Sequence, residues 1–116
     1  MKATLENYRQ APRKVRLVAN LIKGKRVENA ITELDFLVKR ASLPIKKLLK
    51  SAVANAKGAK IETLYISNVM VDKGITLKRM MPRARGTGNP IHKHTSRIII
   101  ELGVKEVAEK KVKKSK

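Results

Sequence analysis

The chain has 116 residues, and its 28 Lys and Arg outnumber its 9 Asp and Glu, which gives a net charge of +19. This length suits one folded unit, and an apolar fraction of 42% argues against disorder throughout. The absence of cysteine excludes disulfides and thiolate metal sites, and no apolar run approaches the ~18 residues of a membrane span. So large an excess of positive charge predicts a polyanionic partner, with nucleic acid first and an anionic membrane second.

The first half of the chain predicts one short strand and three helices. Residues 2–9 alternate weakly between polar and apolar side chains, which is typical of a strand. Pro12 suits the first turn of a helix that Gly24 ends, and residues 27–37 form a second helix. The third helix has the clearest 3.6-residue pattern, and Ser42 is its predicted N-cap. The three apolar faces are sufficient for one small core.

The second half changes to the two-residue period of strands. Residues 64–71 and 98–102 are two apolar, β-rich stretches that we expect to pair with each other and to pack on the helices. Between them, residues 73–100 contain seven Lys or Arg, no acid, and a dense turn signal at residues 86–90. This segment predicts one long hairpin whose two arms extend beyond the core.

The expected fold class is therefore α+β, with three helices packed on a small antiparallel sheet and a long protruding β-hairpin. We expect residues 1–102 to form a single α+β domain that includes the extended hairpin at about residues 73–100. Residues 103–116 are rich in lysine, and a like-charge block of this kind predicts a basic, disordered tail.

The hairpin suggests a function because most of it lies beyond the reach of the core. An arm from residue 75 to residue 85 would extend roughly 35 Å, whereas a compact domain of this size has a radius of gyration of about 13 Å. A two-stranded ribbon alone in water is marginally stable, so its order should depend on an outside partner. Its arginines fit phosphate groups, and the aromatic content of 3% argues against a platform for stacking single-stranded bases. We expect structured nucleic acid, recognised by shape and backbone.

Four blocks of the sequence support this interpretation by their order and spacing: Ala11-Pro12-Arg13-Lys14-Val15-Arg16-Leu17-Val18 with Leu21-Ile22-Lys23-Gly24-Lys25; Ser51-Ala52-Val53-Ala54-Asn55-Ala56; Leu77-Lys78-Arg79-Met80-Met81-Pro82-Arg83-Ala84-Arg85-Gly86; and Lys93 with Thr95 and Ser96. Together they resemble the opening helix, the end of the third helix and the two hairpin arms of the large-subunit ribosomal protein twenty-two family. The resemblance extends from about residue 5 to residue 102. Thr87 and Gly88 depart from it, because the family commonly has arginine and alanine there.

The resemblance implies a structural constituent of the large ribosomal subunit that supports assembly. In the family, the hairpin passes between ribosomal RNA domains and its tip lines the tunnel for nascent peptide. The implied partners are large-subunit ribosomal RNA, neighbouring ribosomal proteins and the nascent peptide, with a monomer in a cytoplasmic or organellar ribosome and no membrane. The expected tunnel-lining tip is Gly86, Thr87, Gly88 and Asn89. The expected RNA-binding residues are Arg13, Lys14, Arg16, Lys78, Arg79, Arg83, Arg85, Lys93 and Arg97.

Two other functions were weighed against this one. An architectural DNA-binding protein would also project basic β-arms, and Pro90 near the turn could wedge open a base step, but such proteins build their cores by dimerisation. An enzyme is not expected, because the sequence shows no activated nucleophile, no catalytic residues and no cofactor loop. His92 and His94 could share one face of a strand, but no nearby acid or cysteine completes a metal shell, so we expect neither metal nor cofactor.

Overall fold

The computed structural model describes residues 1–104, which form three helices and five strands. This confirms the predicted α+β class. The predicted tail lies outside the described residues from residue 105 onward, whereas residues 103 and 104 belong to the last strand. In chain order the elements are β1 (Lys2–Tyr8), α1 (Pro12–Ile22), α2 (Val27–Phe36), α3 (Ser42–Asn55), a 3-10 turn (Ile61–Thr63), β2 (Leu64–Lys73), β3 (Leu77–Pro82), a second 3-10 turn (Ala84–Gly86), β4 (Gly88–Lys93) and β5 (Ser96–Val104).

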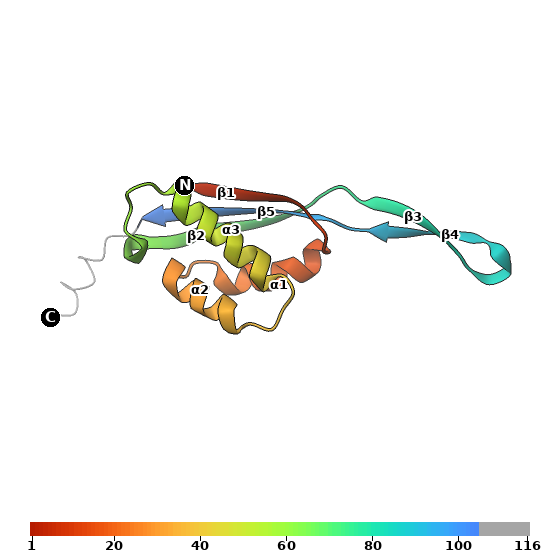
Figure 1. Ribbon diagram of the computed structural model, residues 1–116, viewed down its shortest axis with the longest axis horizontal. Coiled ribbons are helices and arrows are strands. Elements are labelled where there is room, and N and C mark those ends of the chain that lie inside the picture. The colour runs from red at the N-terminus through yellow and green to blue at the C-terminus, as the bar shows by residue number, and fades with distance from the viewer. Residues whose placement is uncertain (105–116) are drawn as a thin grey trace.

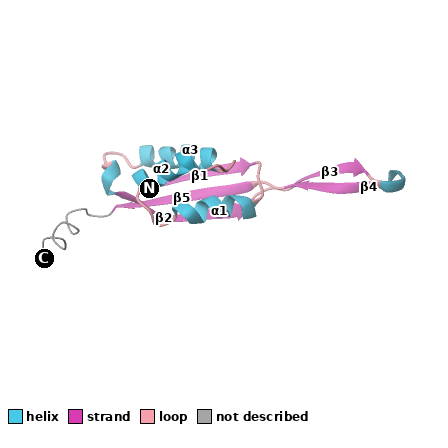
Figure 2. Cartoon of the chain, turned by 90° about the horizontal axis from the view of Figure 1, so that it is seen from below, coloured by secondary structure: helices cyan, strands magenta, loops and turns pink. Residues whose placement is uncertain are grey.

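Three strands form an antiparallel sheet in the order β1-β5-β2, so the last strand lies in the middle. The helices cover one face of this sheet, with α3 over β1 and β5 and α1 over β2 (Figures 1 and 2). Alternate residues of the strands point toward the helices and are buried, in the central strand β5 and in the edge strand β2 alike. Ile98 and Ile100 of β5 meet Val15 and Ile22 of α1 and Ile45 of α3 in one apolar core.

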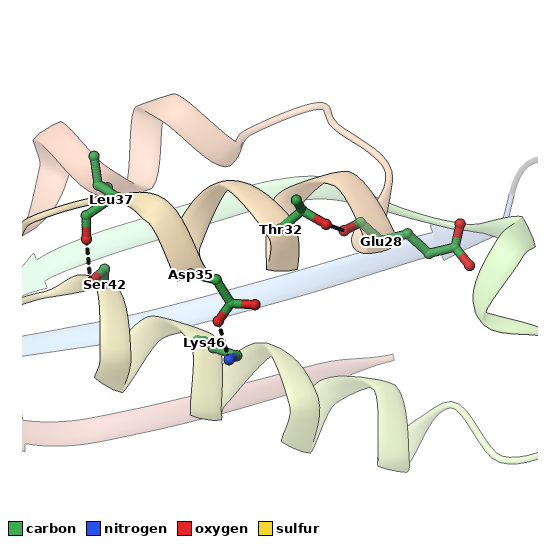
Figure 3. Close-up of polar contacts among 6 residues, drawn as sticks. All are labelled: Glu28, Thr32, Asp35, Leu37, Ser42 and Lys46. Atoms are coloured by element: carbon green, nitrogen blue, oxygen red, sulfur yellow. Dashed lines mark hydrogen bonds and ion pairs between the residues drawn. The ribbon is translucent and has the colours of Figure 1, made fainter.

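The predicted helix ends are correct at α1 and wrong at α3. Pro12 occupies the first turn of α1, and Gly24 follows its end with φ +81°, a conformation that glycine adopts without strain. Ser42 is not the N-cap of α3, because Ala41 occupies that position. The chain turns back before the helix, so the buried Ser42 hydroxyl donates to the Lys39 carbonyl at 2.7 Å. The Leu37 carbonyl lies 3.2 Å from the same hydroxyl and shares its hydrogen (Figure 3).

Strands β3 and β4 form a separate two-stranded ribbon that projects from one end of the body (Figure 1). Every residue from 78 to 90 is exposed, so this ribbon has no core of its own. The molecule measures 75 × 25 × 18 Å with a radius of gyration of 18.6 Å, against about 13 Å for a compact domain of this length. The prediction of a protruding hairpin is confirmed.

The hairpin is shorter than the sequence predicted, because its base belongs to the body. The ladder between the two arms is interrupted after Lys73 and before Ser96, and these two residues pair with each other within the three-stranded sheet. Arg97 therefore lies in the body rather than on a free arm. Sequence periodicity could not reveal this interruption, because alternation continues on both sides of it.

Polar contacts hold the two arms together where the ribbon leaves the body. The Gly74 N–H donates to the Thr95 carbonyl at 2.9 Å, and the Thr95 hydroxyl donates to the Ile75 carbonyl at 2.5 Å. Next to it, the fully buried Ser96 hydroxyl donates to the Gln10 carbonyl at 2.5 Å. A Cβ atom at Gly74 would lie 2.5 Å from the Thr95 hydroxyl, so this junction requires glycine. These contacts fix the direction in which the hairpin leaves the sheet.

We expect Gly74→Ala to destabilise the protein by about 1–3 kcal/mol, because the added methyl displaces a buried hydroxyl that is already hydrogen-bonded. The measurement is the free energy of unfolding from urea denaturation. Gly88→Ala is the matched control, since its Cβ would meet only the flexible end of Met80 at 3.0 Å. Equal, small effects of the two substitutions would contradict the role assigned to the junction.

Candidate nucleic-acid interface

The amphipathic pattern of α1 places cations at its exposed beginning. Val15, Val18 and Ile22 are buried against the sheet, so the helical period turns Arg13 and Lys14 outward. The first turn also points toward the root of the hairpin (Figure 1). The body thus presents positive charge at the end from which the ribbon leaves.

Two adjoining hollows lie between the start of α1 and the hairpin root, and we call them together the α1 cleft. Their volumes are about 330 and 530 Å³, and Arg13 and His94 line both. Lys73 of β2 lines the first hollow, and Lys14 lines the second. The cleft therefore brings cations from a helix and a strand to one concave surface, a shape suited to a phosphate backbone.

Arg16 has a structural contact besides its place in the α1 cleft. Its Nε and Nη2 atoms donate to the Val71 carbonyl at 3.2 and 2.9 Å, which ties α1 to the edge strand β2. The other N–H groups of the guanidinium have no hydrogen-bond partner among residues 1–104. Arg16 thus joins two elements of the fold at the wall of the cleft.

The ribbon carries cations on both of its faces. Arg79 and Lys93 lie on one face, whereas Lys78 and its cross-strand neighbour His92 lie on the other. Within residues 1–104, no acid pairs with Lys78, Arg79 or Lys93, and Arg79 bonds only locally, to the Lys78 carbonyl at 2.9 Å. A ribbon with unpaired charge on both sides can contact polyanions on both sides at once.

The tip is a tight loop closed by a hydrogen bond from the Arg83 N–H to the Thr87 carbonyl at 2.8 Å. Arg85 and Gly86 both adopt left-handed backbone conformations, with φ +59° and +72°. For a residue other than glycine this costs about 1–2 kcal/mol. The Arg85 side chain makes no hydrogen bond or ion pair within residues 1–104 that would offset this cost. The loop thus displays an arginine at the end of the molecule.

Arg97 is separated from the other predicted RNA-binding residues. It lies in β5, where its Nε is 3.5 Å from the Glu6 carboxylate and its cross-strand neighbour in β2 is Asp72. Of the predicted tip residues, Gly86 and Thr87 lie in the turn, whereas Gly88 and Asn89 begin β4 and pair with Pro82 and Met81. The other predicted site residues lie in the first turns of α1 and on the two faces and tip of the ribbon.

His92 lies in β4, and His94 is the residue directly after the end of this strand. Their ring centroids are 6.3 Å apart and the rings are stacked at 16°. In residues 1–104, no three His, Asp or Glu side chains come together in a way that could hold a metal ion. Over the same residues, no helix is both long and apolar enough to cross a membrane.

Comparison with known proteins identifies the family. The family model described as ribosomal protein L22p/L17e matches residues 3–103. The chain belongs to this family. The resemblance found in the sequence is thereby confirmed, and the described fold of helices, sheet and hairpin corresponds to the matched residues almost end to end.

Bacterial members of the family are similar to this chain over most of its length. The large ribosomal subunit protein uL22 of Thermoanaerobacter sp. strain X514 is 46% identical over 108 residues, which cover 90% of this chain and 97% of the relative. The uL22 proteins of Lactobacillus gasseri and Ligilactobacillus salivarius are 44% and 46% identical, over 90% of this chain and 92% and 93% of theirs.

Sequence reasoning missed two residues of the α1 cleft. Lys73 belongs to the acid-free run but is not among the expected RNA-binding residues, and for His94 the sequence favours RNA or solvent contact over a metal pair without placing it in the interface. Both reach the cleft because the chain crosses between body and ribbon at Gly74 and Thr95. Lys73 begins the acid-free run, so this run was the sequence signal that could have assigned Lys73 to the interface.

We expect Arg16→Met to destabilise the fold by about 1–2 kcal/mol, because it removes both donors to the Val71 carbonyl. Arg13→Met removes the same charge from the exposed side of α1 and should change the free energy of unfolding by less than about 0.5 kcal/mol. Urea denaturation of the two variants measures the difference. A similar decrease of the free energy of unfolding in both variants would show that Arg16 is an ordinary surface cation.

Proposed function

We propose that this ribosomal protein binds large-subunit ribosomal RNA through its hairpin and the first turn of α1, and that the hairpin tip lines the tunnel for nascent peptide. Its family is one of structural ribosomal proteins, which agrees with the predicted location in cytoplasmic ribosomes. The proposed RNA contacts are Arg13, Lys14, Arg16, Lys78, Arg79, Arg83, Arg85 and Lys93. We propose that Arg97 contributes less to RNA binding, because Glu6 and Asp72 flank it.

The observation that carries this proposal is the run of exposed residues from 78 to 90, with cations on both faces and no core beneath it. A ribbon that lay on a single RNA surface would need charge on one face only. Charge on both faces fits insertion between two RNA segments, each of which neutralises one side. In this arrangement, RNA supplies the stabilisation that the ribbon lacks, and the ribbon holds the two segments together during assembly.

The body adds a second point of attachment through the α1 cleft. Arg13 and Lys14 are exposed there, and Lys73 and His94 continue the cleft toward the arms. Hydrogen bonds at Gly74 and Thr95 hold the two arms together where the ribbon leaves the body, so we propose that the body and the ribbon contact RNA as one unit. We propose that the protein is a monomer in the ribosome and that the domain includes the hairpin and continues to the end of β5 at residue 104.

The tip is suited to a narrow passage. Gly86, Thr87, Gly88 and Asn89 have small side chains, and a loop of five residues from Arg83 to Thr87 closes the ribbon. Two strands about 5 Å apart are among the thinnest folded structures that a chain can form. We propose that this end reaches the tunnel wall, with Arg83 on RNA at the base of the loop and Arg85 on RNA at its apex.

The geometry supports an architectural DNA-binding function less than the ribosomal one. Pro90 pairs with Met80 within the ladder of the ribbon and does not lie at its apex, so it is badly placed to enter a base step. The helices and the three-stranded sheet bury a core within one chain, so no dimer is needed to complete it. Co-sedimentation with the large subunit, at one copy per particle in a lysate washed at moderately high salt, distinguishes the two functions.

We expect Arg83→Ala combined with Arg85→Ala to weaken binding to purified large-subunit ribosomal RNA about tenfold or more at 0.1 M salt. The slope of log affinity against log salt should fall in magnitude by about 1.5, since two phosphate contacts are lost. Large-subunit assembly should also slow, whereas circular dichroism should show unchanged helices.

Lys47→Ala with Lys50→Ala is the matched control for that variant. It removes the same charge from the exposed face of α3, far from the ribbon, and should leave the salt slope nearly unchanged. If the two double variants behave alike, binding reflects overall charge and the hairpin has no special part in it.

A photo-reactive amino acid in place of Thr87 tests the tip. In ribosomes that carry a stalled nascent peptide, we expect illumination to cross-link this position to the peptide. The same replacement at His92, on the arm, should cross-link to RNA alone. Cross-linking of the tip position to RNA alone would place the end of the hairpin outside the tunnel.

A further inference from the structure

The two faces of the ribbon differ in their chemistry. The register pairs Lys78 with His92, and it pairs Met80 with Pro90 on the same face. His94 shares this face, because its imidazole ring is stacked with that of His92. The second arm therefore presents three ring side chains at two-residue intervals. We call this surface the ring face, and its members are Lys78, Met80, Pro90, His92 and His94.

The rings of this face are free for a partner outside the chain. Pro90, His92 and His94 are all exposed, and Met80 is 72% exposed. Within residues 1–104, neither imidazole makes a side-chain hydrogen bond or an ion pair. The two imidazole planes are 16° apart and their centroids are 6.3 Å apart, close to the ~6.7 Å that two residues of a strand advance. Nearly parallel rings spaced along an arm suit nucleobases, because bases also stack in parallel.

We infer that the ring face stacks unpaired bases of large-subunit ribosomal RNA. This inference rests on the proposed function, since it names what one face of the RNA-binding ribbon recognises. It adds the three rings and Met80 as contacts to bases, beside the cations that contact phosphate groups. The sequence-based expectation of recognition by shape and backbone depended on an aromatic fraction of 3%, which counts Phe, Trp and Tyr and leaves out histidine.

Cations border the ring face where the phosphate groups of such a strand would pass. Lys78 lies directly opposite His92 on the neighbouring arm. At the root of the ribbon, His94 lines the α1 cleft together with Arg13 and Lys73. The segment from residue 73 to residue 100 contains no acid that would repel a phosphate. An RNA strand can thus place its bases on the rings and its phosphates beside the cations.

The outer half of the ring face is not suited to phosphate groups. Proline has no N–H, and the thioether of Met80 is only a weak acceptor, so neither Pro90 nor Met80 offers a side-chain donor to a phosphate oxygen. Both offer exposed apolar surface, and a thioether packs favourably against aromatic rings. The opposite face carries two cations, Arg79 and Lys93, and no ring side chain, so it suits a phosphate backbone. The two faces therefore fit two RNA segments that are recognised in different ways.

Other occupants fit this row of rings less well. Two histidines are too few to hold a metal ion, and in the part of the chain that the structure describes no further His, Asp or Glu joins them. A nascent peptide could pack on Met80 and Pro90, but it has no regular negative charge for Lys78 and the α1 cleft. An RNA strand satisfies the rings and the cations at once.

The first test separates a ring contact from a charge contact. It measures binding of the full chain to purified large-subunit ribosomal RNA at about pH 8, where free imidazole is uncharged. We expect His92→Ala with His94→Ala to weaken binding about tenfold or more with an unchanged salt slope, because stacking releases no counterions. His92→Phe with His94→Phe keeps the rings, so its affinity should stay within about threefold of that of the unmodified protein. An alanine variant that binds normally, or a phenylalanine variant as weak as the alanine one, would overturn the inference.

A second probe removes the bases and keeps the charge. The full chain is mixed with an oligouridine strand of about 12 nucleotides or with an abasic strand of the same length. We expect the unmodified protein and the phenylalanine variant to bind oligouridine about fivefold more tightly, and the alanine variant to bind both strands alike. Lys93→Ala, on the opposite face, is the matched control, and it should lower the salt slope by about 0.7 but keep the preference for bases. A preference that is absent from the unmodified protein, or that persists in the alanine variant, contradicts the inference.

These measurements also separate the inference from the proposed function. If Arg83→Ala with Arg85→Ala weakens binding to ribosomal RNA and the histidine variants do not, the proposed function stands and the ring face has no part in it. If the alanine variant of the histidines weakens binding and the arginine variant does not, the ring face binds RNA and the proposed contacts at the tip fail. If neither variant changes the affinity, both proposals fail.

Discussion

The buried junction at Gly74 and Thr95 is the contact on which the rest of this structure depends. On one side of it lies a body with an apolar core, and on the other a ribbon in which every residue from 78 to 90 is exposed. The two Thr95 oxygens take part in hydrogen bonds to the opposite arm, and only glycine fits at their closest approach. The core therefore orients a ribbon that it cannot itself stabilise by burial.

Unpaired positive charge runs from the first turn of α1 to the tip. Among the described residues on this path, Arg97 beside Glu6 in the body sheet is the exception. Around α2 the charges are mixed: Glu33 pairs with Lys25 and Asp35 with Lys46, while Glu28 makes no ion pair within residues 1–104. Self-repulsion of the basic residues disfavours the isolated chain, and a polyanion would relieve it.

Most of the elements and their order could be predicted, because local pattern determines them. The change of period from 3.6 to 2, Pro12 at a helix start and Gly24 at a helix end were all correct. Ser42 was misjudged as an N-cap, since its hydroxyl bonds backward to Lys39 and Leu37 because of a turn that the helix pattern does not encode. Lys73 and His94 were not foreseen in the α1 cleft, because two segments distant in sequence meet there.

The sequence by itself determined the α+β class, the protruding basic hairpin and the family, since composition, periodicity and motif spacing are properties of the chain alone. Tertiary structure decided how individual cations are used. Arg16 bonds to the Val71 carbonyl and Arg97 lies beside Glu6, whereas Arg85 has no such side-chain contact within residues 1–104. The physical reason is that a side chain's availability depends on which groups long-range packing brings beside it, and strand order, register and the break in the ladder determine those neighbours.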